Sequence, residues 1–396
     1  MSGFAASRLG RLRDVLARQV EAGAAPGAVG LVARAGQTHV VTVGEYGRDT
    51  IFRIASMTKP ITAAAAMILI EECALRLDDP VDDLLPELAG RRVLVRADGP
   101  LSDTVPAQRP VTARDLLTFT FGLGLVFGEP TPIGDELEAL AQGLPRPAVP
   151  PAPADWIRRI GALPLMYQPG ERWLYNTGSD VLGVLIARAS GRPFAEFLAE
   201  RMFGPLGMTD TGFSVPAADL GRLPAELMTD PGTGQTVIFD QPNGQWSSPP
   251  AFASGAAGLV STVDDFAAFA SMLRSLGVSG GSRVLSRASV SLMTADQLTP
   301  SVKAVSGLQA GDFDAAGWGF GVSVVTRRTG LAKSAGSYGW DGGLGTSWFN
   351  DPAEDLTVIL MTQRAFTSPR PGAIFTDFWT SAGSLNQDVP RPPSQP

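Results

Sequence analysis

The chain has 396 residues, of which 44% are hydrophobic and 18% are charged, and its formal net charge is −7. This length allows two domains or one large domain with an insertion, whereas the acidic balance argues against nucleic acid as a partner, because phosphate binding needs a basic surface. One cysteine excludes an internal disulfide, and one histidine, His39 in a predicted strand, argues against a zinc site and against a Ser-His-Asp hydrolase.

The first predicted element is an amphipathic helix, marked by one apolar stripe formed by Leu9, Leu12, Leu16 and Val20. The N-terminal segment lacks the continuous apolar run of a signal peptide, and no stretch of the chain suits a membrane span. We therefore expect a cytoplasmic protein without a membrane partner. The next two stretches, GAVGLVARAG and THVVTVGEYG, alternate in polarity and predict an antiparallel hairpin.

Residues 51–70, IFRIASMTKPITAAAAMILI, predict a short buried strand followed by a long apolar helix that ends near Leu77. Cys73, late in this helix, is expected to be buried as a small hydrophobe. Four aspartates follow in LDDPVDDLLPEL, residues 77–88. They lack the glycine and the closing glutamate of a calcium loop, so we predict solvated caps and no metal site.

Ser56 lies at the junction of strand and helix, and Lys59 follows three residues later. Residues three apart on a helix share one face, so the hydroxyl and the amine can form a hydrogen bond. The chain has only three lysines among its 32 basic residues, and neither Lys303 nor Lys333 has a serine three residues before it. A buried lysine can lose its proton whereas arginine cannot. The pair predicts a serine nucleophile with lysine as proton acceptor; the alternative is a helix N-cap serine with an exposed lysine.

The sequence pattern changes over residues 86–253, where short helical runs such as VTARDLLTF are separated by Pro- and Gly-rich loops. Alternation returns in GFGVSVVTR, SAGSYGWDGG, TSWFND and LTVILMT, and a last helix begins at about Ala373. We expect these strands to join the opening hairpin in one antiparallel sheet flanked by the first and last helices. The predicted fold is α/β (α+β), with an α/β domain at residues 1–85 and 254–388, an inserted, mainly helical domain at 86–253 and a disordered tail at 389–396.

A serine and a lysine still need a group that passes a proton to the leaving group. Tyr175, in QPGERWLYNTGSDVLG, occupies a loop just before an apolar helix, with Pro169 and Gly170 fixing its approach. A phenol in this position can point into a cleft and share a proton with Lys59. The alternative is that Tyr175 only packs against the next helix.

Several motifs, in order over most of the chain, carry a family resemblance: SMTKP at residues 56–60, LDDPVDDLLPEL, DLLTFTFGLG, PGERWLY, FGPLGM, GAAGLVSTVDDFAAF and GWDGGLGTSW. With these motifs the chain resembles the serine hydrolases of the class C β-lactamase and penicillin-binding-protein superfamily, and most closely the family VIII carboxylesterases. The resemblance implies a β-lactamase-like fold in which an α/β domain built from both chain ends meets a helical domain at the active-site cleft.

The resemblance also implies roles for individual residues. Ser56 would be the acylated nucleophile, with Lys59 and Tyr175 as the general base pair. The backbone N–H groups of Ser56 and Gly343 would form the oxyanion hole.

Two stretches depart from the family pattern beside the helical domain. The usual L-L-T-H-T-S-G-L has Phe119 and Phe121 in place of His and Ser. The relatives' Y-x-N has Thr177 where Asn is expected, because the asparagine is shifted to Asn176. We expect Phe119, Phe121 and Thr177 to contribute to substrate binding.

A third departure concerns the turn Trp340-Asp341-Gly342, which falls where penicillin-processing relatives carry K-T-G. These three residues are also expected to bind substrate. A β-lactam or a peptide C-terminus brings a carboxylate, which an ionised Asp341 would repel. We therefore expect neutral, fairly apolar, short-chain substrates.

The sequence thus predicts an enzyme that hydrolyses small-molecule carboxylic esters in two acyl-transfer steps, without a metal or organic cofactor. Three alternatives remain open. A β-lactamase or D-alanyl peptidase would be acylated by a penicillin, and an acyltransferase would use the same residues with an alcohol in place of water. A non-catalytic binding module of the same fold would not be labelled at Ser56 by a fluorophosphonate.

Overall fold

The computed structural model describes residue 4 and residues 6–125 and 128–386, so the predicted disordered tail lies outside the described residues. Its main feature is a seven-stranded sheet in which all neighbours are antiparallel. In spatial order the strands are β11 (Ala316–Trp318), β12 (Ser323–Val325), β13 (Tyr338–Gly342), β14 (Thr346–Asp351), β15 (Leu356–Met361), β1 (Gly27–Arg34) and β2 (Gln37–Gly44). The opening hairpin therefore joins the C-terminal strands through the pair β1 and β15, as predicted from their alternation.

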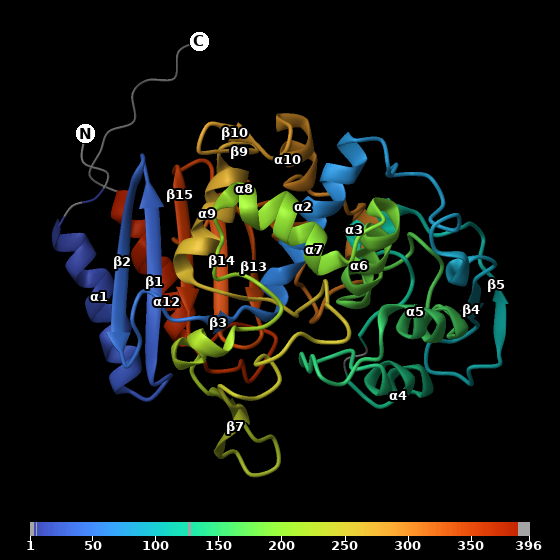
Figure 1. Cartoon of the computed structure of the whole chain (residues 1–396), viewed down its shortest axis with the longest axis horizontal. Helices are drawn as coiled ribbons and strands as arrows, with labels where there is room; N and C mark the ends of the chain where they lie inside the picture. Colours follow the sequence, from blue (N-terminus) through green and yellow to red (C-terminus); the bar gives the residue numbers. More distant parts are fainter. Residues whose placement is uncertain (1–3, 5, 126–127, 387–396) are drawn as a thin grey trace.

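The strands of the sheet carry apolar side chains on both faces, and a layer of helix covers each face. Helices α1 (Ala6–Glu21) and α12 (Ala373–Gly383) pack together on one face, where Leu16 and Phe378 share a fully buried cluster with Val358 of β15. Helix α9 (Val263–Arg274) packs on the other face through rings such as Phe266, which meets Trp348 of β14 edge to face. The predicted sheet flanked by the first and last helices is thus confirmed (Figure 1).

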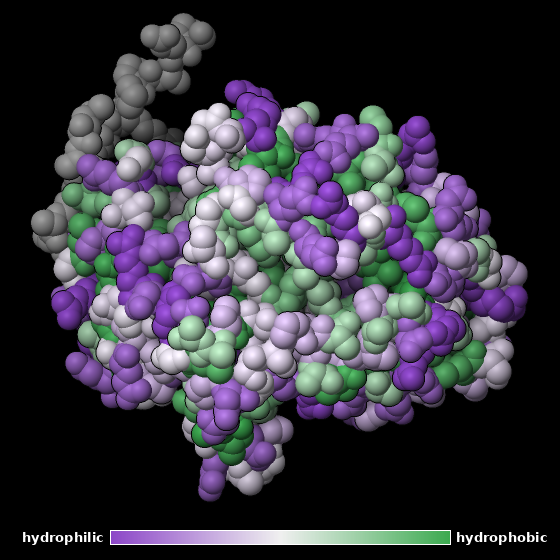
Figure 2. All heavy atoms as spheres, in the orientation of Figure 1, coloured by the Kyte–Doolittle hydropathy of each residue, from purple (hydrophilic) through white to green (hydrophobic). Residues whose placement is uncertain are grey.

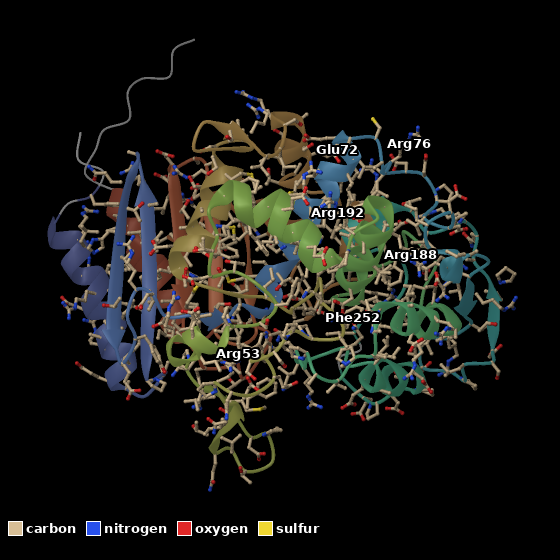
Figure 3. All side chains as sticks on the ribbon, in the orientation of Figure 1. Arg53, Glu72, Arg76, Arg188, Arg192 and Phe252 are labelled. Carbon is tan, nitrogen blue, oxygen red and sulfur yellow. The ribbon has the colours of Figure 1, made fainter. Side chains whose placement is uncertain are left out.

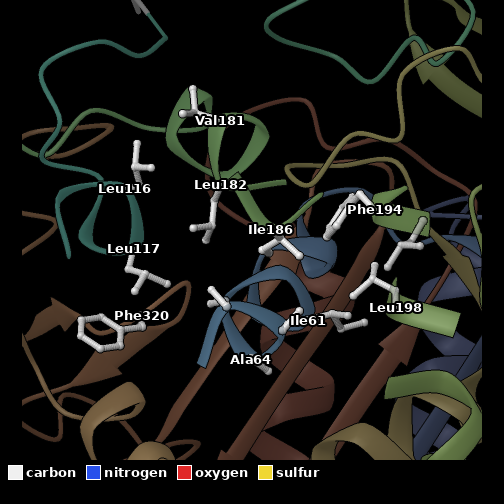
Figure 4. Packing of buried hydrophobic residues seen from close by; sticks show 14 of the residues in the cluster. Ile61, Ala64, Leu116, Leu117, Val181, Leu182, Ile186, Phe194, Leu198 and Phe320 are labelled. Atoms are coloured by element: carbon white, nitrogen blue, oxygen red, sulfur yellow. The ribbon is translucent and has the colours of Figure 1, made fainter. Parts of the chain in front are cut away.

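Helix α2 (Thr58–Glu71) lies at the centre of the molecule and links the sheet to the helical part. Helix α2 packs against α6 (Thr177–Ser190), and Figure 4 shows Leu182 and Ile186 of α6 pointing toward α2. Because α2 is apolar on every side, nearly all of its residues are buried, with Ile61 and Ala64 at 0% exposure.

The segment between β3 (Phe52–Arg53) and β8 (Val260–Ser261) holds α2, α6 and most of the remaining elements. Its other α-helices are α3 (Ala113–Thr118), α4 (Pro132–Ala139), α5 (Pro153–Ala162), α7 (Phe194–Leu198) and α8 (Gly204–Leu206). It also contains two small hairpins that the sequence did not predict, β4 (Arg92–Leu94) with β5 (Thr104–Pro106) and β6 (Glu226–Thr229) with β7 (Thr236–Asp240). The second hairpin forms the projection at the bottom of Figures 1 and 2. Later short elements are β9 (Val278–Ser279), β10 (Ser282–Arg283), α10 (Arg287–Met293) and α11 (Pro300–Ala304).

Two predictions about the central stretch are corrected. Helix α2 ends at Glu71 rather than near Leu77, because Cys73 adopts a left-handed conformation (φ 58°) that closes the helix. Cys73 is exposed, not buried in the helix. The strand before Ser56, β3 (Phe52–Arg53), is buried as predicted, but it pairs with β8 (Val260–Ser261) rather than with the main sheet.

Among the described residues, no helix combines the length and the apolar character needed to cross a membrane.

Candidate active site

Ser56 lies in a one-turn 3₁₀ helix, η1 (Ala55–Met57), between β3 and α2. Ala55, directly before it, has φ 42°, in the left-handed region that residues other than glycine rarely adopt. The turn is fixed by the Ile54 carbonyl, which accepts from Met57 N–H at 3.0 Å and from Thr346 Oγ1 at 3.2 Å. Strained backbone of this kind persists where surrounding contacts over-determine it, and it brings the half-buried Ser56 side chain to the start of α2.

The Lys59 amine is fully buried and meets three oxygen atoms. Nζ lies 2.9 Å from Ser56 Oγ, 2.8 Å from Asn176 Oδ1 and 2.8 Å from the Ala256 carbonyl. Burial lowers the pKa of Lys59 from 10.5 to about 7, and the nearby Asp180 carboxylate opposes that shift. A neutral amine has two hydrogens, which the two carbonyl oxygens accept, so its lone pair is left for the Ser56 hydroxyl.

Tyr175 lies beside the pair, in the loop that leads into α6. Its ring centroid is 4.4 Å from Lys59 Nζ, and its hydroxyl has two hydrogen-bond partners, Ser56 and the Trp340 indole, whose Nε1 donates at 2.8 Å. Burial raises the pKa of the phenol above its usual value, although the hydrogen bonds with Ser56 and Trp340 oppose the rise. The phenol therefore keeps its proton near neutral pH, whereas Lys59 can lose its own.

The end of β13 runs directly against the turn that holds Ser56. A Cβ atom added to Gly342 would lie 2.3 Å from the Ile54 carbonyl oxygen, so only glycine fits there. Gly343 follows, and its carbonyl accepts from Phe366 N–H at 2.8 Å, which fixes the peptide beyond the strand. This close approach places the predicted oxyanion donors, the N–H groups of Ser56 and Gly343, on adjoining segments.

Trp340 and Asp341 point to opposite faces of β13, as successive strand residues do. Trp340 contacts Tyr175, whereas Asp341 pairs across the strands with Ser347, its hydrogen-bond partner on the α12 side of the sheet. Burial raises the pKa of Asp341, and the charge of Lys333 opposes that shift. Asp341 nevertheless lines the cavity beside Trp340, so the repulsion of a substrate carboxylate by an ionised Asp341 stays a prediction.

Three residues expected to bind substrate lie in the interior. Phe119, at 1% exposure, closes α3 with φ 61° and packs against Trp318 with ring centroids 4.9 Å apart. Phe121 and Thr177 are both at 0% exposure, and Thr177 donates to Gln142 Oε1 at 2.9 Å. We therefore expect these three side chains to support the wall of the site rather than to touch substrate.

Sequence reasoning missed the acceptors of the Lys59 amine. Asn176 is displaced by one residue from the family position, yet it reaches Lys59, with its backbone at φ 81°. That displacement was the available signal. Ala256 acts through its main-chain carbonyl, which no side-chain pattern can reveal.

A cavity of about 190 Å³ lies next to Trp340. Its lining includes the aromatic residues Trp173, Phe313 and Trp318 and three charged residues, Asp312, Asp341 and Arg370. Arg370 lies 3.7 Å from Asp312, so its charge is already paired. Within the described ranges, no three His, Cys, Asp or Glu side chains converge in the way a metal site requires.

Comparisons with known proteins identify the family and the fold. The family model described as Beta-lactamase matches residues 12–376. Over 326 residues the chain is 40% identical to Protein Rv1367c of Mycobacterium tuberculosis, covering 80% of this chain and 78% of that one. Over 394 residues it is 32% identical to Esterase EstB of Burkholderia gladioli, covering 91% and 92%. The solved structure of EstCE1, described as a hydrolase with promiscuous acyltransferase activity, matches with a TM-score of 0.78 at 25% identity, covering 95% of this chain and 99% of that one.

Proposed function

This chain belongs to the beta-lactamase family, and on that premise we propose that it hydrolyses neutral carboxylic esters through an acyl-enzyme on Ser56. One observation carries the proposal: a fully buried lysine amine, 2.9 Å from a serine hydroxyl, with both of its remaining hydrogen-bond directions taken by carbonyl oxygens. Such an amine is poised to accept the serine proton.

In the first step, Ser56 Oγ bonds to the ester carbonyl carbon while its proton passes to Lys59. The charge that develops on the carbonyl oxygen is stabilised by the N–H groups of Ser56 and Gly343. Tyr175, which keeps its proton, donates it to the alcohol oxygen as the ester bond breaks, and the proton on Lys59 then restores the phenol. Water repeats the sequence on the acyl-enzyme and releases the acid.

The substrate class follows from the groups around Tyr175. The position of the lysine in K-T-G is taken by Trp340, whose indole N–H already donates to Tyr175 and which carries no charge for a substrate carboxylate. The adjoining cavity is lined by aromatic rings, and Arg370 within it is paired with Asp312. Apolar surface with few unpaired charges favours neutral acyl or alcohol groups.

A panel of p-nitrophenyl esters, anilides and β-lactams tests the proposal. We expect ester hydrolysis by the wild-type protein and none by Ser56→Ala, and we expect fluorophosphonate to add one label at Ser56 by intact-protein mass spectrometry. Full-rate hydrolysis by Ser56→Ala would refute the nucleophile. Turnover of β-lactams in preference to esters would favour the β-lactamase alternative.

Acyl transfer is a second candidate, because EstCE1, at 25% identity, is described as a hydrolase with promiscuous acyltransferase activity. The two reactions share the acyl-enzyme and differ in whether water or an alcohol attacks it. Product analysis with an added alcohol distinguishes them, since an acyltransferase would form the new ester in preference to the acid.

A further inference from the structure

Asp180 is a buried carboxylate in the first turn of α6, at 3% exposure, and three donors surround it. Its Oδ2 accepts from Gln142 Nε2 at 2.8 Å, and its Oδ1 accepts from Ser254 Oγ at 2.7 Å and from Ala256 N–H at 3.0 Å. An ionised carboxylate can only accept hydrogen bonds, so it determines which end of each neighbouring group must face it.

A chain of side-chain amides joins Asp180 to the Lys59 amine. Because Gln142 turns its NH₂ group to Asp180, its Oε1 faces the other way and accepts from Asn176 Nδ2 at 3.1 Å and from Thr177 Oγ1 at 2.9 Å. Asn176 consequently turns its own oxygen to Lys59 Nζ, at 2.8 Å. Each amide has one donor end and one acceptor end, so the direction of the whole chain is set at Asp180.

A second, shorter route leads from Asp180 to the same amine. Ala256 donates its N–H to Asp180 and accepts from Lys59 Nζ through its carbonyl. Both carbonyl acceptors of the amine are thus held by one carboxylate. The ionisable groups that face the amine are Asp180 and Tyr175, and Arg146 lines a small cavity beside Asp180.

We propose that Asp180 is a positioning residue that fixes the direction of this amide chain and so keeps the lone pair of Lys59 aimed at Ser56 Oγ. The proposal rests on the proposed function, since that lone pair matters only if Ser56 is acylated. With both amine hydrogens held by Asn176 and Ala256, the hydroxyl of Ser56 is the group left to meet the lone pair.

Asp180→Asn tests the proposal because it replaces one oxygen by an NH₂ group with almost no change of shape. Ser254 and Ala256 occupy the oxygen of the new amide, so its NH₂ group faces Gln142. Gln142 must then present its oxygen to position 180 and its NH₂ group to Asn176, which turns its own NH₂ group toward Lys59. We expect kcat to fall by about 10- to 100-fold with little change in KM, as for other groups that orient a catalytic side chain.

The pH profile gives a readout that a merely structural role would not move. Removing the negative charge disfavours the ammonium form, so the acidic limb of kcat should move to lower pH in Asp180→Asn. An unchanged kcat and an unchanged profile would overturn the proposal.

Asp180→Asn combined with Gln142→Glu is the matched rescue. The NH₂ group at position 180 then donates to a carboxylate at position 142, whose oxygens also accept from Asn176 and Thr177, so the original direction returns and the charge is conserved. We expect the double variant to regain most of the lost kcat, whereas Gln142→Glu alone places two carboxylates side by side and should not match it. A folded double variant no more active than Asp180→Asn would overturn the proposal.

Two controls separate this proposal from the proposed function. Thermal melts by circular dichroism identify variants that are unfolded. The rate of fluorophosphonate labelling at Ser56, measured across pH, reports the nucleophile without any ester substrate. Absence of ester hydrolysis in the wild type with intact labelling would reject the proposed substrate class, and the labelling rates of the same variants would still decide the role of Asp180.

Discussion

Trp340→Phe isolates one hydrogen bond in the site, the bond from the Trp340 indole to the Tyr175 hydroxyl at 2.8 Å. Phenylalanine keeps an aromatic ring near Trp318 and Tyr175, whose ring centroids lie 4.7 Å and 5.7 Å from that of Trp340, but it removes the donor. A neutral hydrogen bond contributes about 0.5–1.5 kcal/mol. If the bond stabilises the transition state through Tyr175, kcat should fall by roughly 2- to 13-fold, since about 1.4 kcal/mol corresponds to tenfold.

The assay is a double-mutant cycle on hydrolysis of a short-chain p-nitrophenyl ester. We expect Trp340→Phe to have no further effect in the Tyr175→Phe background, because the acceptor is already gone. Trp379→Phe is the matched control: it removes another indole bond, to Ser347 Oγ at 3.1 Å, on the α12 side of the sheet, and should leave kcat unchanged. Equal losses from Trp340→Phe in both backgrounds would refute the reasoning.

Three further predictions concern the base, the core and the cysteine. The pKa of Lys59 is lowered to about 7 and the amine must be neutral to accept a proton, so kcat/KM of the wild-type protein should rise with pH up to about 7 and then level off. Lys59→Arg should be inactive from pH 5 to 9.5, because arginine keeps its proton. A wild-type kcat/KM that does not change across this pH range would contradict the role of Lys59 as the base. Arg53→Ala should lower the free energy of unfolding by about 3–5 kcal/mol in urea titrations, since Asp240, 2.6 Å from Arg53, would remain buried without its partner. Arg76→Ala is the control, because loss of the exposed pair with Asp79 should lower the free energy of unfolding by less than about 1 kcal/mol. Figure 3 labels both arginines. Similar losses of stability in the two variants would count against this explanation. Cys73 is exposed and should react with one equivalent of a disulfide reagent in the native protein; protection until denaturant is added would show that it is buried.

Local patterns predicted the parts of the molecule that local physics determines. Alternating polarity identified six of the seven strands of the main sheet, whereas β11 lies before the predicted stretch GFGVSVVTR. The interval of three residues between Ser56 and Lys59 predicted their 2.9 Å contact. The same period of two along β13 places Asp341 and Trp340 on opposite faces of the strand. The end of α2 was missed because its stop signal is a left-handed cysteine, a residue that rarely takes this role.

The groups around the Lys59 amine could not be predicted because their proximity is a tertiary result. Gln142 and Ala256 lie on loops far from α2 in the sequence, and the carbonyl of Ala256 is common to every residue type. Burial, which lowers the pKa of Lys59, also depends on the packing of α2 against α6. A motif supplies the reacting side chains, whereas their protonation depends on neighbours that only the folded chain assembles.

The pairing of β1 with β15 has a consequence for folding during translation, because the two strands are far apart in the sequence. Ser56 and Lys59 are translated well before the turn bearing Gly343 and before β15. A nascent chain therefore carries its nucleophile before the segment that closes against it, so acyl chemistry should begin only after β13, β14 and β15 have left the ribosome.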